Sequence, residues 1–386
     1  MMYKKLAIAV LASSMVLTAC GGKETAKPVE PAKTQASETK PASVTHEALV
    51  KAYKDMVDEL AKGKDGGKID WEKVEKTYNE QFKKLVQDRD SEYSEKLDQE
   101  ISSAIKAGKD GAMKSDIVKQ VVDKLGQKVF FLTLRHNFKT IEDNISDKAK
   151  AKAELDQAKA FYNGVLKSTV EKRDKAYETQ MVTAIEGALK DMDAAVEGGK
   201  KLEFSLAKQV VDKTLMKTFY LATGGAQGYV YKIENAVKEG KDPKVEQAEG
   251  WAFYQSLHGY LVKSAKEDAE LIQNKLDLKT ATKDIKGDEL NKAFVRGFAV
   301  VAKNEYEESF KNWGKDKGVI TALEGALFIQ LIEADAKKLL GEEQTKALLV
   351  KADEFLKAAK ANDKAKADAL YKEIQPSLDK LAKAGK

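Results

Sequence analysis

The sequence predicts an all-α protein, arranged as an elongated array of tandem helical repeat units. The first observation is composition: 42% of the 386 residues are hydrophobic, 33% are charged and only five are prolines, which is typical of helical proteins. The second is that no stretch alternates apolar and polar residues between hairpin turns, as strands do. The third is a set of short sequences that recur at intervals of roughly 80–90 residues.

The first twenty residues predict export and lipid attachment. Lys4 and Lys5 precede the apolar run Leu6–Leu17, which is too short for an ordinary transmembrane helix. Small residues then precede Cys20, as in bacterial lipoprotein signals. We therefore expect residues 1–19 to be a signal peptide, and Cys20 to carry the lipid that anchors the chain to a membrane of the bacterial cell envelope, on its periplasmic or cell-surface side. The alternative is an ordinary secretory leader with a chance cysteine.

A flexible tether is predicted for residues 20–44. This segment is rich in Ala, Lys, Glu, Thr, Ser and Pro and has almost no large apolar side chains, so it cannot bury enough surface to fold. Because Cys20 is the only cysteine, the chain can form no internal disulfide. The net charge is only +5 and there is no dense basic block with interleaved aromatic residues, so nucleic acid is not an expected partner.

Residues 45–386 are predicted to fold as a series of helices. Thr45 is placed to cap the first helix, and the glycines within 63–67 end it. Apolar residues at helical spacing then predict one long helix from Ile69 to Lys106. After further glycines, Ser115 begins the next helix.

Internal repeats divide this helical part. The hexapeptide Lys119–Lys124 recurs unchanged as Lys208–Lys213, 89 positions later. Arg89-Asp90-x-x-Tyr93 recurs as Arg173-Asp174-x-x-Tyr177, 84 positions later. Such repeats stack on their neighbours to bury a shared core. We expect units at about 70–157, 158–242 and 243–340, followed by two Ala- and Lys-rich helices within 342–384.

An acid-Gly-x-x-aromatic motif marks the second half of the chain. It occurs as Glu249-Gly250-x-x-Phe253, and a related stretch recurs at Ala322–Ile332. A weaker copy at Gln157–Leu166 has a glutamine in place of the acid. These stretches are therefore candidates for a repeated binding element, with the first copy the weakest.

Helical geometry separates the polar groups of the Glu249 stretch. At 100° per residue, Glu249 lies on one stripe with Phe253 and Tyr260, whereas His258 lies with Trp251 about half a turn away. Glu249 and His258 therefore cannot bind one ion from within this helix. Each would need partners from another helix.

Acids and tyrosines on the preceding helices supply such partners. Carboxylate and phenolate oxygens, with an occasional histidine, suit hard or borderline cations such as Fe(III). Inward carboxylates from facing helices are a known way to build metal sites in bundles. The candidate metal ligands are Glu142, Tyr231, Glu234, Glu249, His258, Glu305, Glu308 and Glu324. Glu234 and Tyr231 are the first candidate partners for Glu249. The alternative is that these are ordinary solvated acids, and Glu324 with Thr321 also fits a capping box.

Catalytic constellations are weak, and we expect a protein that is not an enzyme. The three histidines form no zinc-like pair, and no Gly-x-Ser-x-Gly motif occurs. The glycine-rich stretch 223–228 lacks the Lys-Ser/Thr ending of a phosphate loop, so it is predicted as a break between helices.

Together these motifs resemble the Fea1-like family of low-iron-inducible periplasmic proteins. The resemblance rests on Phe219-Tyr220, Tyr231–Ala236 and Glu249–Tyr254; it is clearest over 208–262 and fainter over 119–166 and 290–332. It implies a repeated helical protein, held at the cell surface or secreted, that binds iron for uptake. Related proteins carry a His-Glu pair where this chain has Tyr231-Lys232, so the ligand set differs here.

The function expected from the sequence is therefore an envelope-anchored lipoprotein that captures iron, or another metal, and passes it to a membrane iron transporter. The main alternative is a structural lipoprotein whose helices form a spacer or a protein-docking surface. A second alternative is a cell-envelope enzyme or a small-ligand binding protein that uses the stripe of Trp251, Tyr254 and His258 as a pocket wall.

Overall fold

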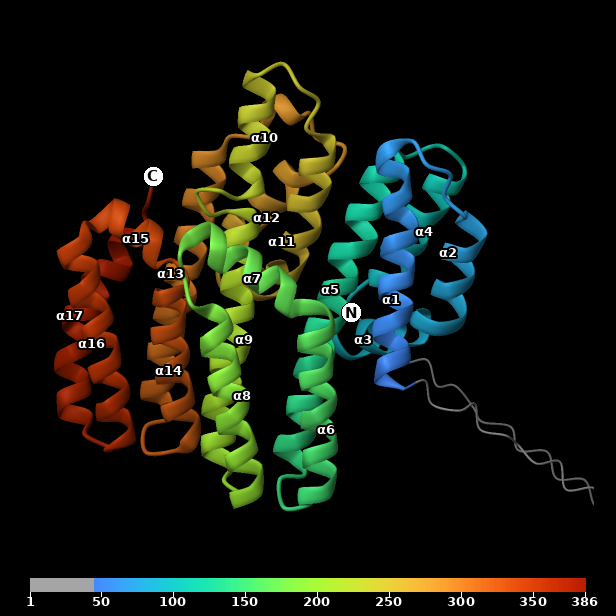
Figure 1. Cartoon of the computed structure of the whole chain (residues 1–386). Coiled ribbons are helices and arrows are strands. Elements are labelled where there is room, and N and C mark those ends of the chain that lie inside the picture. The colour runs from blue at the N-terminus through green and yellow to red at the C-terminus, as the bar shows by residue number, and fades with distance from the viewer. Residues whose placement is uncertain (1–44) are drawn as a thin grey trace, which may run out of the picture. The chain divides into compact units, whose positions relative to one another are not determined.

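The computed structural model describes residues 45–386, and these residues are all-α, with no β-strand among them. The predicted signal peptide, Cys20 and tether lie outside the described residues. In chain order the helical elements are α1 (His46–Ala61), η1 (Lys62–Asp65), α2 (Trp71–Thr77), η2 (Tyr78–Phe82), α3 (Lys83–Tyr93), α4 (Leu97–Lys109), α5 (Ser115–Asp143), α6 (Lys148–Phe161), η3 (Tyr162–Leu166), α7 (Lys167–Tyr177), α8 (Met181–Gly198), α9 (Lys201–Thr223), α10 (Tyr229–Lys238), α11 (Lys244–Ser264), α12 (Lys266–Leu276), η4 (Thr282–Asp284), α13 (Gly287–Lys311), α14 (Asp316–Leu331), α15 (Glu333–Leu340), α16 (Glu342–Lys360) and α17 (Lys364–Leu381) (Figure 1).

Several predicted helix boundaries are confirmed. Thr45 caps α1, since its hydroxyl oxygen accepts a hydrogen bond from the amide of Ala48 at 3.3 Å. Helix α5 begins at Ser115, and the glycine-rich stretch 223–228 separates α9 from α10. The two predicted C-terminal helices are α16 and α17. Between residues 45 and 386, none of the helices combines the length and the apolar character needed to cross a membrane.

The prediction of one long helix from Ile69 to Lys106 is wrong. A π-helical segment, η2, interrupts it, and Ser94 ends α3 in the left-handed conformation with φ of 58°. The carboxylate of Asp90 accepts hydrogen bonds from the amides of Leu97 and Asp98, both at 2.8 Å. These amides would otherwise be unpaired at the start of α4, so Asp90 stabilises a break that apolar spacing alone does not reveal.

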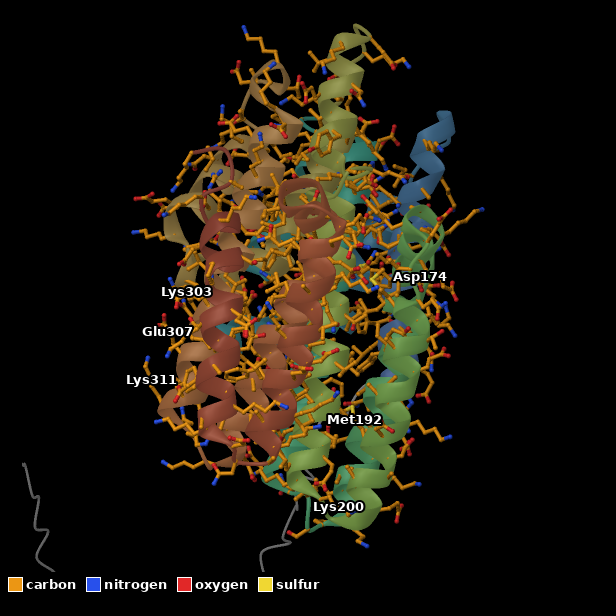
Figure 2. All side chains as sticks on the ribbon, turned by 90° about the vertical axis from the view of Figure 1, so that its left-hand side faces the viewer. Asp174, Met192, Lys200, Lys303, Glu307 and Lys311 are labelled. Atoms are coloured by element: carbon orange, nitrogen blue, oxygen red, sulfur yellow. The ribbon has the colours of Figure 1, made fainter. Side chains whose placement is uncertain are left out.

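The same local design recurs 84 positions later. The π-helical segment η3 follows α6, and Glu178 ends α7 in the left-handed conformation with φ of 53°. The carboxylate of Asp174 accepts hydrogen bonds from the amides of Met181 and Val182, at 2.8 and 2.9 Å. Asp174 is labelled in Figure 2. The recurring sequence Arg-Asp-x-x-Tyr therefore encodes a turn between two helices.

Helices α5 and α9 lie at the centre of the packing. Helix α5 contacts α1, α4, α6 and α11, and α9 contacts α7, α8, α11 and α14 (Figure 1). Both helices bury most of their residues, including charged ones, because neighbours cover them on several sides. Outer helices keep a charged face, as the row of Lys303, Glu307 and Lys311 on α13 illustrates (Figure 2). The buried charges on α5 and α9 define the candidate site.

Candidate functional site

The repeated hexapeptide places an adjacent Asp-Lys pair inside the core. On α5, Lys124 is only 7% exposed, and its Nζ lies 2.9 Å from Asp123 Oδ2 and 3.2 Å from Glu249 Oε1 on α11. The ring of Phe253 lies 5.1 Å from the same Nζ, within cation–π range. We call Asp123, Lys124 and Glu249 the first lysine clamp.

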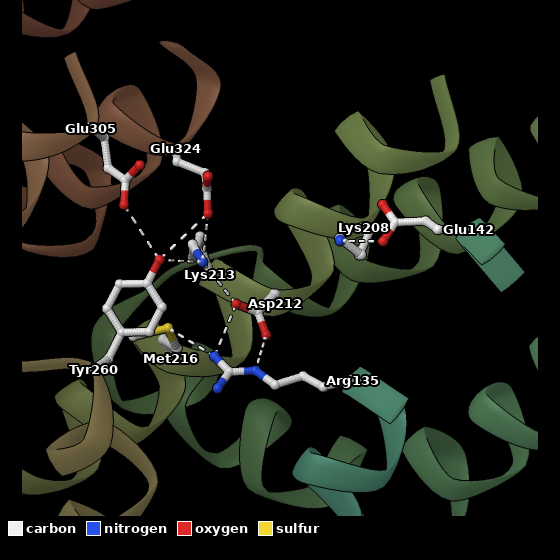
Figure 3. A network of polar contacts seen from close by, with 9 residues as sticks. All are labelled: Arg135, Glu142, Lys208, Asp212, Lys213, Met216, Tyr260, Glu305 and Glu324. Carbon is white, nitrogen blue, oxygen red and sulfur yellow. Dashed lines mark hydrogen bonds and ion pairs between the residues drawn. The ribbon is translucent and has the colours of Figure 1, made fainter. Parts of the chain in front are cut away.

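A second lysine clamp repeats this arrangement on α9. Lys213 is 3% exposed, and its Nζ lies 2.9 Å from Asp212 Oδ2 and 3.0 Å from Glu324 Oε1 on α14. The ring of Phe328 lies 5.2 Å from this Nζ. The acid-Gly-x-x-aromatic motif and the repeated hexapeptide are therefore two halves of one contact, made twice. Figure 3 shows Asp212, Lys213 and Glu324 of the second lysine clamp.

The glycine of the motif also has a packing role. A Cβ at Gly250 would come within 2.9 Å of the Cβ of Tyr229, and a Cβ at Gly325 would come within 2.9 Å of the Tyr306 ring. The helix backbone therefore approaches a tyrosine closely at both places, which a side chain would prevent. Acid, glycine and aromatic residue together serve the packing of α11 and α14.

The prediction that Glu249 pairs with Glu234 and Tyr231 is wrong. Glu249 faces Lys124, while Glu234 accepts a hydrogen bond from the amide of Gly287 at 2.8 Å, at the first residue of α13. Glu234 also pairs with Lys238 at 3.0 Å. The backbone hydrogen bond, more than the lysine, lowers the pKa of Glu234.

Tyr231 packs at the same helix start. A Cβ at Gly287 would come within 2.4 Å of its ring, so the tyrosine lies directly against the backbone there. Burial and then the acid Asp288 raise the pKa of Tyr231 to about 12. Glu234 and Tyr231 therefore cap and cover α13 and do not meet Glu249.

Two further predicted ligands are paired with lysines. Glu142 lies 2.7 Å from Lys208, and Glu308 accepts a hydrogen bond from Lys317. Among residues 45–386, no group of three or more His, Cys, Asp or Glu side chains that could hold a metal ion forms at either glutamate. Both acids behave as members of ordinary ion pairs.

His258 lies apart from Glu249, as the helical spacing predicts. Its ring meets that of Tyr254 edge to face, with centroids 5.6 Å apart. Burial, followed by the nearby ammonium of Lys128, lowers the pKa of His258. Glu95 and Glu270 favour the charged form of this histidine and oppose that lowering only in part.

Glu324 does not form a capping box with Thr321. Helix α14 begins at Asp316, so both residues lie inside the helix. The Thr321 hydroxyl donates to the carbonyl oxygen of Lys317 at 2.9 Å instead. Glu324 is thus free to serve the second lysine clamp.

Two predicted ligands, Glu305 and Glu324, converge on the side chain of Tyr260. The hydroxyl of Tyr260 on α11 lies 3.4 Å from Glu305 Oε1 on α13 and 3.5 Å from Glu324 Oε1 on α14. Lys213 donates to the same hydroxyl at 3.2 Å. We call these four residues the Tyr260 site (Figure 3). It adjoins a cavity of about 230 Å³ that is also lined by Arg135, Phe138, Lys208, Gln209 and Asp212.

Charges at this site are matched except at Glu305. Arg135 holds Asp212 through two hydrogen bonds, at 2.6 and 3.0 Å. Burial alone would lower the pKa of Lys213, but Asp212 and Glu324 outweigh it and raise that pKa well above its ordinary value. Glu305 forms no ion pair with any residue in the range 45–386. Burial and then the charge of Glu324 raise the pKa of Glu305 to about 7.

Comparisons with protein families, with curated proteins and with solved structures found no match for this chain. The resemblance to the Fea1-like family, and the iron binding that it implies, therefore stay predictions.

Sequence reasoning missed the partners that define these sites. Lys124, Lys213, Asp212 and Arg135 were not among the candidates, and Tyr260 was only placed on the Glu249 stripe. A signal was present, because each Asp-Lys pair directly follows two valines and is followed by a leucine one or two positions later. A charged pair on the buried face of a helix requires a partner of opposite charge on a neighbouring helix.

The raised pKa of Glu305 predicts a pH-dependent stability. The carboxyl releases its proton near pH 4.5 in the unfolded chain and near pH 7 in the folded protein. Between these values the folded state binds more protons, so the free energy of unfolding falls as the pH rises. Glu305→Gln removes this titrating group. On going from pH 5 to pH 8, the free energy of unfolding of the variant should therefore rise by about 1–2 kcal/mol relative to that of the wild type. Urea unfolding at both pH values measures this difference in the free energy of unfolding, with Glu307→Gln as the exposed control on α13. An equal pH dependence in the wild type and Glu305→Gln would contradict the assignment.

Proposed function

We propose that this chain is an envelope-anchored lipoprotein that captures a metal cation, with iron the first candidate, at the Tyr260 site. The observation that carries the proposal is the convergence of two carboxylates and one phenol from three helices, with Glu305 left without a cation. Burial and then repulsion by Glu324 raise the pKa of Glu305, and a cation bound between the two carboxylates would remove that repulsion. Carboxylate and phenolate oxygens are ligands that ferric iron accepts.

Lys213 limits this site in its present arrangement. Its ammonium lies 3.0 Å from Glu324, where it neutralises one of the two carboxylates. A metal ion would have to compete with Lys213 for Glu324, leaving the lysine to Asp212. Binding also releases the proton of Glu305, so affinity should fall as the pH drops below about 7. Such a site favours reversible capture followed by transfer to a membrane iron transporter.

The proposal extends to the architecture and the anchor. We infer that the recurring turns and lysine clamps belong to tandem repeat units stacked in an elongated array. We further propose that Cys20 is lipidated and holds the chain on the periplasmic or cell-surface side of a bacterial membrane. The protein acts as a binding protein in this account, with no catalytic step.

A structural or protein-docking lipoprotein is the second candidate. It is favoured because most of the other predicted ligands have structural partners. Glu142, Glu249 and Glu308 are in ion pairs, and Glu234 caps a helix. In this case the charges stabilise helix packing and the outer faces carry the function. A site-specific photo-crosslinker on the exposed face of α8 or α17 should then capture one defined envelope protein in cells, and no specific product would argue against docking there.

Metal titration separates the two candidates. The metal-free full chain should bind ferric or ferrous iron with one saturable transition, measured by calorimetry. Glu305→Gln and Tyr260→Phe should each weaken binding at least tenfold, about 1.4 kcal/mol. Lys213→Met should strengthen it, since the competing ammonium is gone, while Glu308→Gln, an ion-paired acid on α13, should leave it unchanged. The absence of saturable binding, or equal binding by wild type and Glu305→Gln, rules out the Tyr260 site.

The anchor has its own test. Cys20→Ala should move the protein from the membrane fraction to the soluble fraction, because the lipid attachment point is lost. Fractionation of cells followed by immunodetection measures this. Retention of the variant in washed membranes would show that Cys20 is not the anchor.

A further inference from the structure

A cation lies five residues after the Asp of each lysine clamp, and α13 carries a third cation at the same spacing after Asn291. Two of these three cations are buried and have a dedicated acid, whereas the third is half-buried. On α5 this cation is Lys128, whose Nζ lies 2.7 Å from Glu95. On α13 the same spacing after Asn291 gives Arg296, whose Nε lies 2.8 Å from Asp268. On α9 it gives Lys217, for which residues 45–386 offer no ion pair.

The recurring turn shows which position would have to carry an acid to pair with Lys217. Glu95 directly follows the left-handed residue Ser94, and the residue that follows the equivalent Glu178 is Thr179. The hydroxyl of Thr179 donates to Asp174 at 2.6 Å, so it turns toward the cap of α8. The second turn therefore keeps its geometry but lacks the carboxylate that pairs with the lysine in the first.

Lys217 instead borders a cavity of about 540 Å³ that is lined by residues of α7, α9, α14, α15 and the first residue of α16. Burial lowers the pKa of Lys217, and the acid Glu333 only partly offsets this effect. Glu333 is itself paired with Lys337 at 3.0 Å. An ammonium in such surroundings is short of negative charge, which a bound anion would supply.

The rest of the lining indicates what kind of anion fits. Leu221, Leu331 and Ala334 form an apolar part of the wall. The lining lysines Lys337 and Lys338 are each held by acids, the first by Glu333 and Glu342 and the second by Asp335, so among residues 45–386 Lys217 is the lining cation without an ion pair. The acid at the cavity that is not in an ion pair is Glu178, which is exposed. A carboxylate on a short alkyl chain matches this combination, since its charge would meet Lys217 and its chain the leucines.

We propose that this cavity binds a small organic carboxylate, with Lys217 as the anchoring cation. The bound carboxylate takes the place that Glu95 occupies beside Lys128. The site lies on α7, α9, α14, α15 and the start of α16 and uses none of the residues of the Tyr260 site, so it stands independently of the proposed metal binding.

Calorimetric titration of the full chain with butyrate tests the proposal, with phosphate and butylamine as comparison probes. Butyrate should bind saturably in the millimolar range, and butylamine should not bind. Lys217→Met should weaken butyrate binding at least tenfold, whereas Lys201→Met, an exposed lysine of α9, and Glu305→Gln should leave it unchanged.

Thr179→Glu provides the second variant. The new carboxylate should pair with Lys217 as Glu95 pairs with Lys128, so butyrate binding should be lost while the melting temperature rises. This outcome separates blocking of the site from unfolding. The proposal is overturned if the wild type does not bind butyrate, if both variants bind it as the wild type does, or if phosphate binds and butyrate does not.

Discussion

The packing of this protein depends on two buried lysines. Lys124 and Lys213 each lie inside the core with an adjacent aspartate, and each reaches a glutamate more than a hundred positions away along the chain. Taking an ammonium out of water costs several kcal/mol unless carboxylates and good geometry offset it. Each lysine therefore ties α11 or α14 to its central helix in one register. The aromatic and glycine residues of the same motif complete that contact.

This constraint explains why a recurring acid motif does not by itself mark a metal site. Glu249 was a natural candidate ligand, but a cation of the protein already occupies the position beside it. The sites that can still bind a ligand are those where one charged side chain of the repeated pattern has no partner of opposite charge. Glu305 is an acid without a cation, and Lys217 is a cation without an acid. Departures from an otherwise consistent pattern are where function is expected.

Much of the fold followed from local sequence signals. The all-α class, the cap at Thr45, the start of α5 and the C-terminal helices all depend on periodicity and capping residues close together in the chain. The break after Tyr93 did not follow, because it is stabilised by Asp90 reaching the amides of the next helix. Apolar spacing continues across that break and gives no warning of it.

The candidate site was less accessible from sequence. The repeated hexapeptide and the acid-Gly-x-x-aromatic motif were each visible, yet their pairing requires knowledge of which helices are neighbours in space. Glu305 and Glu324 converge on the hydroxyl of Tyr260. Glu142 and Glu308 have the same chemistry but are each paired with a lysine. Which acids meet depends on the direction of their side chains across neighbouring helices. Helical spacing within one segment of the sequence does not give that direction.

The most direct test of the account is a double-mutant cycle on the first lysine clamp, with Lys124→Met, Glu249→Gln and the double variant compared by urea unfolding. If Lys124 and Glu249 form a buried structural pair, the single changes are each strongly destabilising and the coupling energy is about 2 kcal/mol or more. A coupling energy near zero would contradict the account, because Glu249 would then be free of Lys124 and available as a ligand.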